Sequence, residues 1–224
     1  MNLKFLKLLG AGFVMFQKPS NYISYKSCKK WLKYEYPTDL IYGGINENIN
    51  CEHLVPRFII KKYNVEKEAE KDLHLLWLAN GRLNSQRQHY KFDSFTADEK
   101  NIVALDEFGY TTKNTDNYHC RKHVKSQRFE PPVESRGIIA RSVGYFYFTY
   151  NYECSNELLD IPKLIEWHKK YPVTSIEKEK NEKIYTIQKN KNIFIEKPFY
   201  LTFYFSPIMV YYRKIFPKNY ALEK

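Results

Sequence analysis

The sequence predicts one α+β domain that is mostly helical and is built around a small ββα motif. Residues 49–53 and 73–78 have the length and composition of two short strands, and residues 83–90 follow as a helical segment. Helical patterns also cover much of residues 131–188. With 224 residues, of which 43% are hydrophobic, the chain can bury one good core, and it contains no internal repeat or evident linker.

The first strand is expected to end before Pro56, because proline cannot donate a ladder hydrogen bond. Charged residues precede the second strand and Asn80-Gly81 follow it, as is typical of strand ends. Residues 93–128 are polar and contain Gly109, so we expect a long connection over the protein surface.

Pro131-Pro132 suits the start of a helix. This helix is expected to bury a stripe of residues at helical spacing, with Arg136 and Arg141 outside the stripe. The stripe consists of Ile139, Val143, Phe146, Tyr147 and Tyr150.

Two further helices follow. Asp160 can cap the first of them, which carries Leu164 and Trp167 and ends at Pro172. Thr174 and Glu177 predict a capping box at the start of the second.

We divide the chain into an N-terminal extension (1–48), the main domain (49–198) and an aromatic, apolar appendage (199–224). Within the extension, the apolar run 8–16 fits an export signal, a buried segment or a membrane-surface anchor. Residues 199–212 are too short to span a membrane. They are expected to pack on the domain, with contact to a partner protein or a membrane surface as the alternative.

The most informative chemistry lies in the segments 50–53, 72–74 and 84–87. Glu52 and the side-chain carbonyl of Asn84 are oxygen ligands of the kind that magnesium prefers. His53 can accept a proton from water near neutral pH without binding the metal. Arg87 lies three residues after Asn84, on the same face of a helix, where it can hold phosphate oxygens. Together these groups suit the hydrolysis of a phosphodiester.

The charge balance indicates a polyanionic partner. Lysine plus arginine number 36 against 25 acidic residues, which gives a net charge of +11. Such an excess is typical of proteins that bind nucleic acid, and a merely solvated basic surface is the alternative. No nucleotide cofactor is expected.

These segments resemble the endonuclease I family of periplasmic and secreted nonspecific nucleases, which have a ββα-metal active site. The resemblance covers residues 50–198 and rests on several pieces that occur in the same order. They are Asn-Cys-Glu-His-x-x-Pro at 50–56, Asp-x-His at 72–74, Asn-x-x-Arg at 84–87, Phe-Glu-Pro-Pro at 129–132, Arg136-Gly137, Ala140-Arg141, Trp167-His168, Glu-Lys-Asn at 179–181, Gln-x-Asn-x-Asn-x-Phe at 188–194, and Pro198.

The resemblance implies that Glu52 and Asn84 hold magnesium, or another divalent cation such as manganese, and that His53 is the general base. It also implies cleavage of DNA, and often of RNA, without strong sequence preference, to 5′-phosphate and 3′-hydroxyl products. Arg57 is the candidate for the family's additional active-site arginine, and the alternatives are Lys61 and Lys62.

Further residues have supporting roles in this interpretation. His74 is expected to be a structural histidine that is hydrogen-bonded beside the metal centre. Glu130 either contacts a basic side chain near the substrate or interacts with the start of a helix. Contacts to nucleic acid are expected from Arg136, Arg141, Lys189 and Lys191.

The chain also departs from the family pattern. Leu78 stands where a proline is usual, and Lys189, Lys191 and Ile193 alter the late element. Lysine lacks the bidentate fork of arginine, so the turn geometry and the arginine contact of that element are in question. The candidate metal centre is unaffected.

Two other functional classes compete with a nuclease. A noncatalytic nucleic-acid-binding or packaging protein would retain the fold, although it would not need a base beside a carboxylate. A zinc-dependent hydrolase would centre on His119, Cys120 and His123, for which no fourth ligand is evident.

Cysteines 28, 51, 120 and 154 allow three pairings if all are oxidised. Exported members of the family use disulfides, and Cys51 occupies the position of one of their cysteines, which makes Cys28–Cys51 the guessed pair. By the resemblance, the expected location is the periplasm or the exterior of the cell, with a virion or the cell interior as alternatives.

Overall fold

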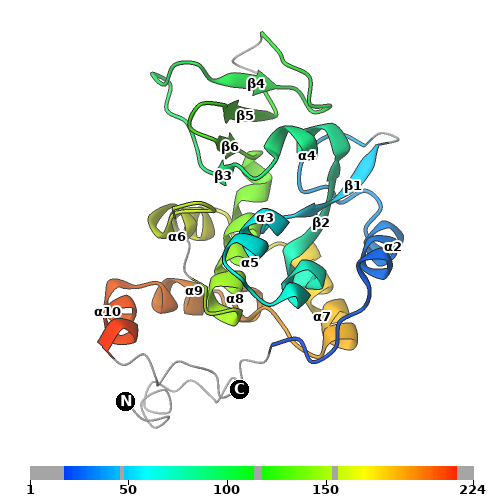
Figure 1. The fold of residues 1–224 in the computed structure, drawn as a ribbon, viewed down its shortest axis with the longest axis vertical. Coiled ribbons are helices and arrows are strands. Elements are labelled where there is room, and N and C mark those ends of the chain that lie inside the picture. Colours follow the sequence, from blue (N-terminus) through cyan, green and yellow to red (C-terminus); the bar gives the residue numbers. More distant parts are fainter. Residues whose placement is uncertain (1–17, 46–47, 114–117, 153–155, 216–224) are drawn as a thin grey trace.

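The computed structural model describes residues 18–45, 48–113, 118–152 and 156–215 (Figure 1). It has the mostly helical α+β fold that the sequence predicts. The helices are α2 (Tyr25–Glu35), α3 (Arg57–Lys62), α4 (Gly81–Arg87), α5 (Arg136–Thr149), α6 (Ile161–Lys170), α7 (Ser175–Gln188), α8 (Ile193–Glu196), α9 (Phe199–Tyr204) and α10 (Pro207–Ile215). The strands are β1 (Ile49–His53), β2 (Leu76–Asn80), β3 (Lys91–Phe92), β4 (Val103–Leu105), β5 (Cys120–His123) and β6 (Arg128–Glu130), and 3-10 turns occupy Lys67–Lys71, Leu73–Leu75 and Val133–Ser135.

The ββα motif is present. β1 pairs antiparallel with β2, and α4 follows β2 directly. β2 begins later than predicted, because the Asp72 side chain accepts a hydrogen bond from the backbone N–H of His74 and closes a 3-10 turn there. α4 begins earlier than predicted, because the Asn80 side chain caps its first turn.

The segment 93–128, predicted as a long connection over the surface, contains two strands, β4 and β5, that the sequence did not predict. Strands β3 to β6 form a four-stranded sheet in the order β3-β6-β5-β4, which lies beside α4 at one end of the molecule (Figure 1). Leu105 of β4 and Phe129 of β6 are fully buried and join the main core. Strands this short show too little alternation for the pattern to be recognised in the sequence.

α5 is the central helix of the core. The predicted stripe is buried throughout, and its most exposed member, Tyr150, is 9% exposed. The capping box of Thr174 and Glu177 is present at the start of α7. Asp160 precedes α6 as predicted, but its side chain makes an ion pair with Lys91 at 2.6 Å instead of a cap hydrogen bond.

Parts of both flanking regions pack on the domain. From α2, Leu32 joins a buried cluster with Leu76 and Leu78 of β2. At the other end, Leu201 of α9 and the following Phe205 are buried. α10 exposes Ile208, Tyr211 and Ile215, and contact of this helix with a partner protein or a membrane surface stays a prediction.

Among the described residues, no helix is long and apolar enough to cross a membrane. The run 8–16 lies outside the described residues. Cys28 and Cys51 are buried, free thiols, so the guessed Cys28–Cys51 bridge is wrong for this structure. Cys154 lies outside the described residues.

Candidate active site

Glu52 and His53 are the last two residues of β1. In the β1–β2 register, Glu52 lies opposite Trp77 and His53 lies opposite Leu76. Consecutive strand residues point to opposite faces, so the two can serve one centre only where the strand ends. The strand does end there, and the chain leaves it through residues 54–56.

Asn84 lies on α4, next to this strand end. Its Nδ2 donates to the backbone carbonyl of Cys51 at 3.5 Å. The Asn80 side chain positions the helix by accepting hydrogen bonds from the N–H groups of Arg82 at 3.0 Å and Leu83 at 3.3 Å. The structure therefore brings Asn84 to the strand that carries the predicted ligand and base.

Glu52 is almost completely buried, with 2% exposed. Burial raises the pKa of its carboxyl group, and the Arg87 charge and the Tyr42 hydroxyl oppose this rise. Its Oε1 lies 3.1 Å from Nη1 of Arg87, yet it accepts no well-oriented hydrogen bond from the described residues. A buried carboxylate oxygen with unused lone pairs favours a nearby cation.

Glu52 and Asn84 therefore fit a hard divalent cation. Both offer oxygen atoms, and two protein ligands leave the remaining octahedral positions to water and substrate. The structural feature that supports this fit is Oε1 of Glu52, which is buried and accepts no hydrogen bond from the described residues although Arg87 lies beside it.

His53 is held on two sides. Its Nε2 lies 3.1 Å from the backbone carbonyl oxygen of Glu70, and its ring stacks on Tyr25 with centroids 5.1 Å apart. A carbonyl can only accept, so Nε2 carries the proton and Nδ1 keeps a free lone pair. Burial, followed by the Arg57 charge, lowers the pKa of His53 to about 4, which keeps the imidazole neutral at pH 7.

Arg57 is the predicted arginine that remains accessible beside this base. Its side chain is 44% exposed, and its Nε lies 3.2 Å from the Glu70 carboxylate. Its guanidinium lies over the Tyr25 ring at 4.5 Å.

Arg87 has a different environment from the one expected of a phosphate ligand. It is 1% exposed and donates to the backbone carbonyls of His53 at 3.2 Å and Leu54 at 3.0 Å. Its guanidinium also lies 4.3 Å from the Phe92 ring centroid. Direct contact of Arg87 with phosphate stays a prediction that this geometry does not support, and the side chain instead fixes the end of β1.

His74 lies in a buried polar network. Its Nε2 is 3.3 Å from the carbonyl oxygen of Asn190, and the neighbouring Asp72 accepts hydrogen bonds from Tyr145 at 2.8 Å and Tyr150 at 2.9 Å. No hydrogen bond or ion pair among the described residues joins His74 to Glu52. Its hydrogen bonds are those of a structural histidine, and the carbonyl that its ring contacts belongs to the late element. Its predicted place beside the metal centre stays a prediction.

Glu130 contacts basic side chains, as one of its two expected roles requires. It pairs with Arg121 and, at 2.9 Å, with Arg136. All of these side chains are at least four-fifths buried. Because Arg121 lies on β5, Glu130 on β6 and Arg136 on α5, the ion pairs join these three elements.

The expectation that Arg141 lies outside the buried stripe is wrong. Arg141 is 1% exposed and donates to both oxygens of Glu177, at 2.6 and 2.7 Å. A buried arginine is tolerated here because the carboxylate and the carbonyls of Tyr171 and Pro172 use its donors. Four of its five N–H donors are used in this way and the side chain is buried, so it is not placed to contact nucleic acid.

The two lysines of the late element lie at the surface. Lys189 is exposed and ends α7 in the left-handed conformation, at φ 60°. The turn therefore forms without a glycine there. Lys191 pairs with Glu182 and lies 3.6 Å from Glu196. Their contact with nucleic acid stays a prediction.

The predicted zinc ligands have other partners. Nε2 of His119 accepts a hydrogen bond from the Gly43 N–H at 2.8 Å, Cys120 is fully buried, and His123 bonds to Ser126. The described part of the chain contains no group of three or more His, Cys, Asp or Glu side chains that could hold a metal.

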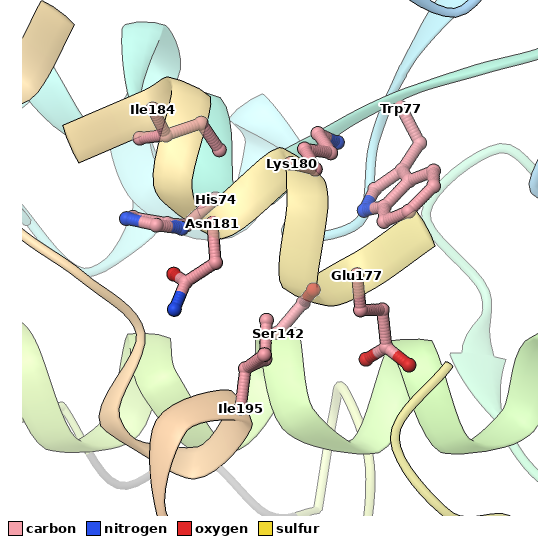
Figure 2. A pocket seen from close by; sticks show the side chains of 8 residues that line it. All are labelled: His74, Trp77, Ser142, Glu177, Lys180, Asn181, Ile184 and Ile195. Carbon is pink, nitrogen blue, oxygen red and sulfur yellow. The ribbon is translucent and has the colours of Figure 1, made fainter. Parts of the chain in front are cut away.

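Sequence reasoning missed Tyr25 and Glu70, and it assigned no role to Lys180, which lies in the Glu-Lys-Asn piece at 179–181. The first two hold the candidate base from outside the matched motifs. Lys180 lines a small pocket together with Trp77, Glu177 and Asn181 (Figure 2). Its Nζ donates to the Leu76 carbonyl at 2.6 Å and lies 3.5 Å from the Trp77 ring centroid. The spacing of Lys180 on α7, between buried Glu177 and Ile184, was the available signal.

The fold and these residues define a ββα type of site, with Glu52, His53 and Asn84 at the end of β1. The family model for endonuclease I matches residues 15–199, so the chain belongs to the endonuclease I family.

Curated relatives agree with this family. The chain is 32% identical over 140 residues to "Endonuclease-1" of Buchnera aphidicola. This alignment covers 62% of this chain and 49% of the relative. It is 32% identical over 132 residues to a periplasmic deoxyribonuclease of Aeromonas hydrophila, an alignment that covers 58% of this chain and 49% of the relative. It is 28% identical over 131 residues to an extracellular deoxyribonuclease of the same organism, an alignment that covers 58% of this chain and 51% of the relative. The chain thus spans about half the length of the curated relatives it matches.

Proposed function

We propose that this protein is a magnesium-dependent endonuclease that hydrolyses DNA without strong sequence preference. In this proposal RNA is a further substrate, and the products carry 5′-phosphate and 3′-hydroxyl ends. The observation that carries the proposal is the convergence of Glu52, His53 and Asn84 at the end of β1. Family membership and the names of the relatives support it.

The general base is His53. Its Nε2–H is occupied by the Glu70 carbonyl, so Nδ1 accepts the proton of the attacking water. Because the imidazole is neutral at pH 7, this nitrogen is available without prior deprotonation. Stacking on Tyr25 fixes the plane of the ring.

Glu52 and Asn84 would hold the ion, which supplies positive charge to the phosphorane and the departing 3′ oxygen. Arg57 is exposed beside the base and contacts a phosphate oxygen in this proposal. Arg87 positions Glu52 and the end of β1 from within the core. No covalent enzyme intermediate is needed, because water is the nucleophile.

We also propose that the protein acts outside the cytoplasm. Two relatives are named as periplasmic and extracellular deoxyribonucleases, which supports this location.

The test is nicking of supercoiled plasmid by the wild type and by His53→Ala, with magnesium and then with EDTA. We expect nicking by the wild type in magnesium alone and a loss of at least about a hundred-fold in the variant. His123→Ala is the matched control, because this histidine lies on β5 and its loss should leave nicking unchanged. Full nicking by His53→Ala would remove that residue from the mechanism. Duplex binding without nicking by the wild type would favour a packaging protein.

A further inference from the structure

The exposed face of α3 combines three cations with one aromatic ring. The two isoleucines of this helix are buried, whereas Arg57, Phe58, Lys61 and Lys62 are exposed. The helix contains no acidic residue. Its outer face therefore suits a ligand that offers both negative charge and a flat apolar surface.

Phe58 lies at the edge of the ββα motif. The residue is 50% exposed, and its ring packs on that of His89 with centroids 4.8 Å apart. α3 follows β1 through residues 54–56, and His89 follows α4 through Gln88. Arg87 ties these two segments together by donating to the His53 carbonyl at 3.2 Å. His89 thus supports the Phe58 ring, and Arg87 links this region to the strand end that carries the candidate base.

Three cations share the exposed face of α3 with this ring, and Lys62 lies close to it. Arg57 keeps 44% of its side chain exposed. Nζ of Lys62 lies 5.8 Å from the Phe58 ring centroid and also pairs with Glu157. Lys61 forms no ion pair with any described residue. A single exposed phenylalanine needs no explanation. One that shares a helix face with cations and follows the candidate active site closely in the chain resembles a base-stacking surface.

We propose that Phe58 is a stacking platform for an unpaired base of single-stranded DNA, with Arg57 and Lys61 on the adjacent phosphates. The inference rests on the proposed nuclease function, because it places the platform beside the candidate base. A base inside a duplex is covered by its neighbours on both faces, whereas an unpaired base can offer one face to the ring. The platform therefore adds a preference for single-stranded or locally opened DNA.

The test measures, in EDTA, the binding of a short fluorescent single strand, of its duplex, and of an abasic strand of equal length. We expect Phe58→Ala to weaken binding of the single strand by about ten-fold, since one stacked base typically contributes that much. Binding of the duplex and of the abasic strand should stay within about two-fold, because it depends on charge. Phe58→Trp should bind the single strand at least as well as the wild type.

Tyr34→Ala is the matched control, since Tyr34 is 82% exposed on α2 and its loss should change none of the three affinities. A 2-aminopurine in the single strand gives a second readout, because stacking on Phe58 should quench it and Phe58→Ala should restore its fluorescence. Equal loss of single-stranded and abasic binding, or no loss of either, overturns the proposal. Plasmid nicking is scored separately, so failure of the nuclease function and failure of the platform give different results.

Discussion

Nη1 of Arg87 lies 3.1 Å from Oε1 of Glu52, and both side chains are at most 3% exposed. The same guanidinium donates to the carbonyls of His53 and Leu54. One buried arginine thus fixes both the candidate metal ligand and the backbone of the candidate base. Removing one member of such a pair leaves the other charged and buried without compensation.

Arg87→Met should therefore lower the free energy of unfolding by about 3–5 kcal/mol. Urea denaturation in EDTA measures the change. Arg82→Met is the matched control, because Arg82 is exposed on the same helix and should cost less than about 1 kcal/mol. If both variants are equally stable, the role assigned to Arg87 is incorrect.

Tyr25 tests how the base is held. Tyr25→Ala removes the ring that stacks on His53 and should lower the turnover rate for plasmid about ten-fold with little change in KM, because misorientation of a base affects chemistry more than binding. Tyr25→Phe retains the ring and should stay near the wild-type rate. If Tyr25→Phe is as slow as Tyr25→Ala, the stacking role of Tyr25 is contradicted.

Lys180 should make stability depend on pH. Burial lowers its pKa to about 7, from 10.5 when exposed. Between these values the unfolded chain binds a proton that the folded protein has lost, so this group makes stability rise with pH from about 7 to about 10.5. Below pH 7 both states are protonated, and the full cost of burying the ammonium remains.

Lys180→Met removes this dependence. The stability of the variant relative to the wild type should be highest at pH 6 to 7 and should decrease as the pH rises toward 10. Urea denaturation across this range measures it, with the exposed Lys178→Met on the same helix as control. A relative stability that is flat with pH would show that the ammonium is not buried as described.

The excess of basic residues, net +11, predicts that duplex binding is dominated by phosphate contacts. The logarithm of the affinity should fall linearly with the logarithm of salt concentration, and unrelated sequences should bind equally. Fluorescence anisotropy in EDTA measures both. Strong discrimination between duplex sequences at one salt concentration would contradict backbone recognition.

The elements around the site could be predicted because their signals are local. β1 ends as the proline at 56 indicates, and the capping box at Thr174 and Glu177 starts α7. The environments of Arg87 and Arg141 could not be predicted in this way. Arg141 is compensated by Glu177, which lies 36 residues away, and no spacing in the sequence marks a pair formed by packing of two helices.

The same limit applies to the support of the base. Tyr25 comes from α2, far from the matched motifs, and Glu70 contributes a backbone carbonyl that no residue type reveals. The four-stranded sheet was missed because its strands are too short to show alternation.

Binding of manganese, as a spectroscopic substitute for magnesium, to the wild type, Glu52→Gln and His53→Ala tests the central claim most directly. The account predicts one bound ion in the wild type, at least about ten-fold weaker binding in Glu52→Gln, and near wild-type binding in His53→Ala, which should nevertheless fail to nick plasmid. Equal manganese binding by the wild type and Glu52→Gln would contradict a metal centre at the end of β1.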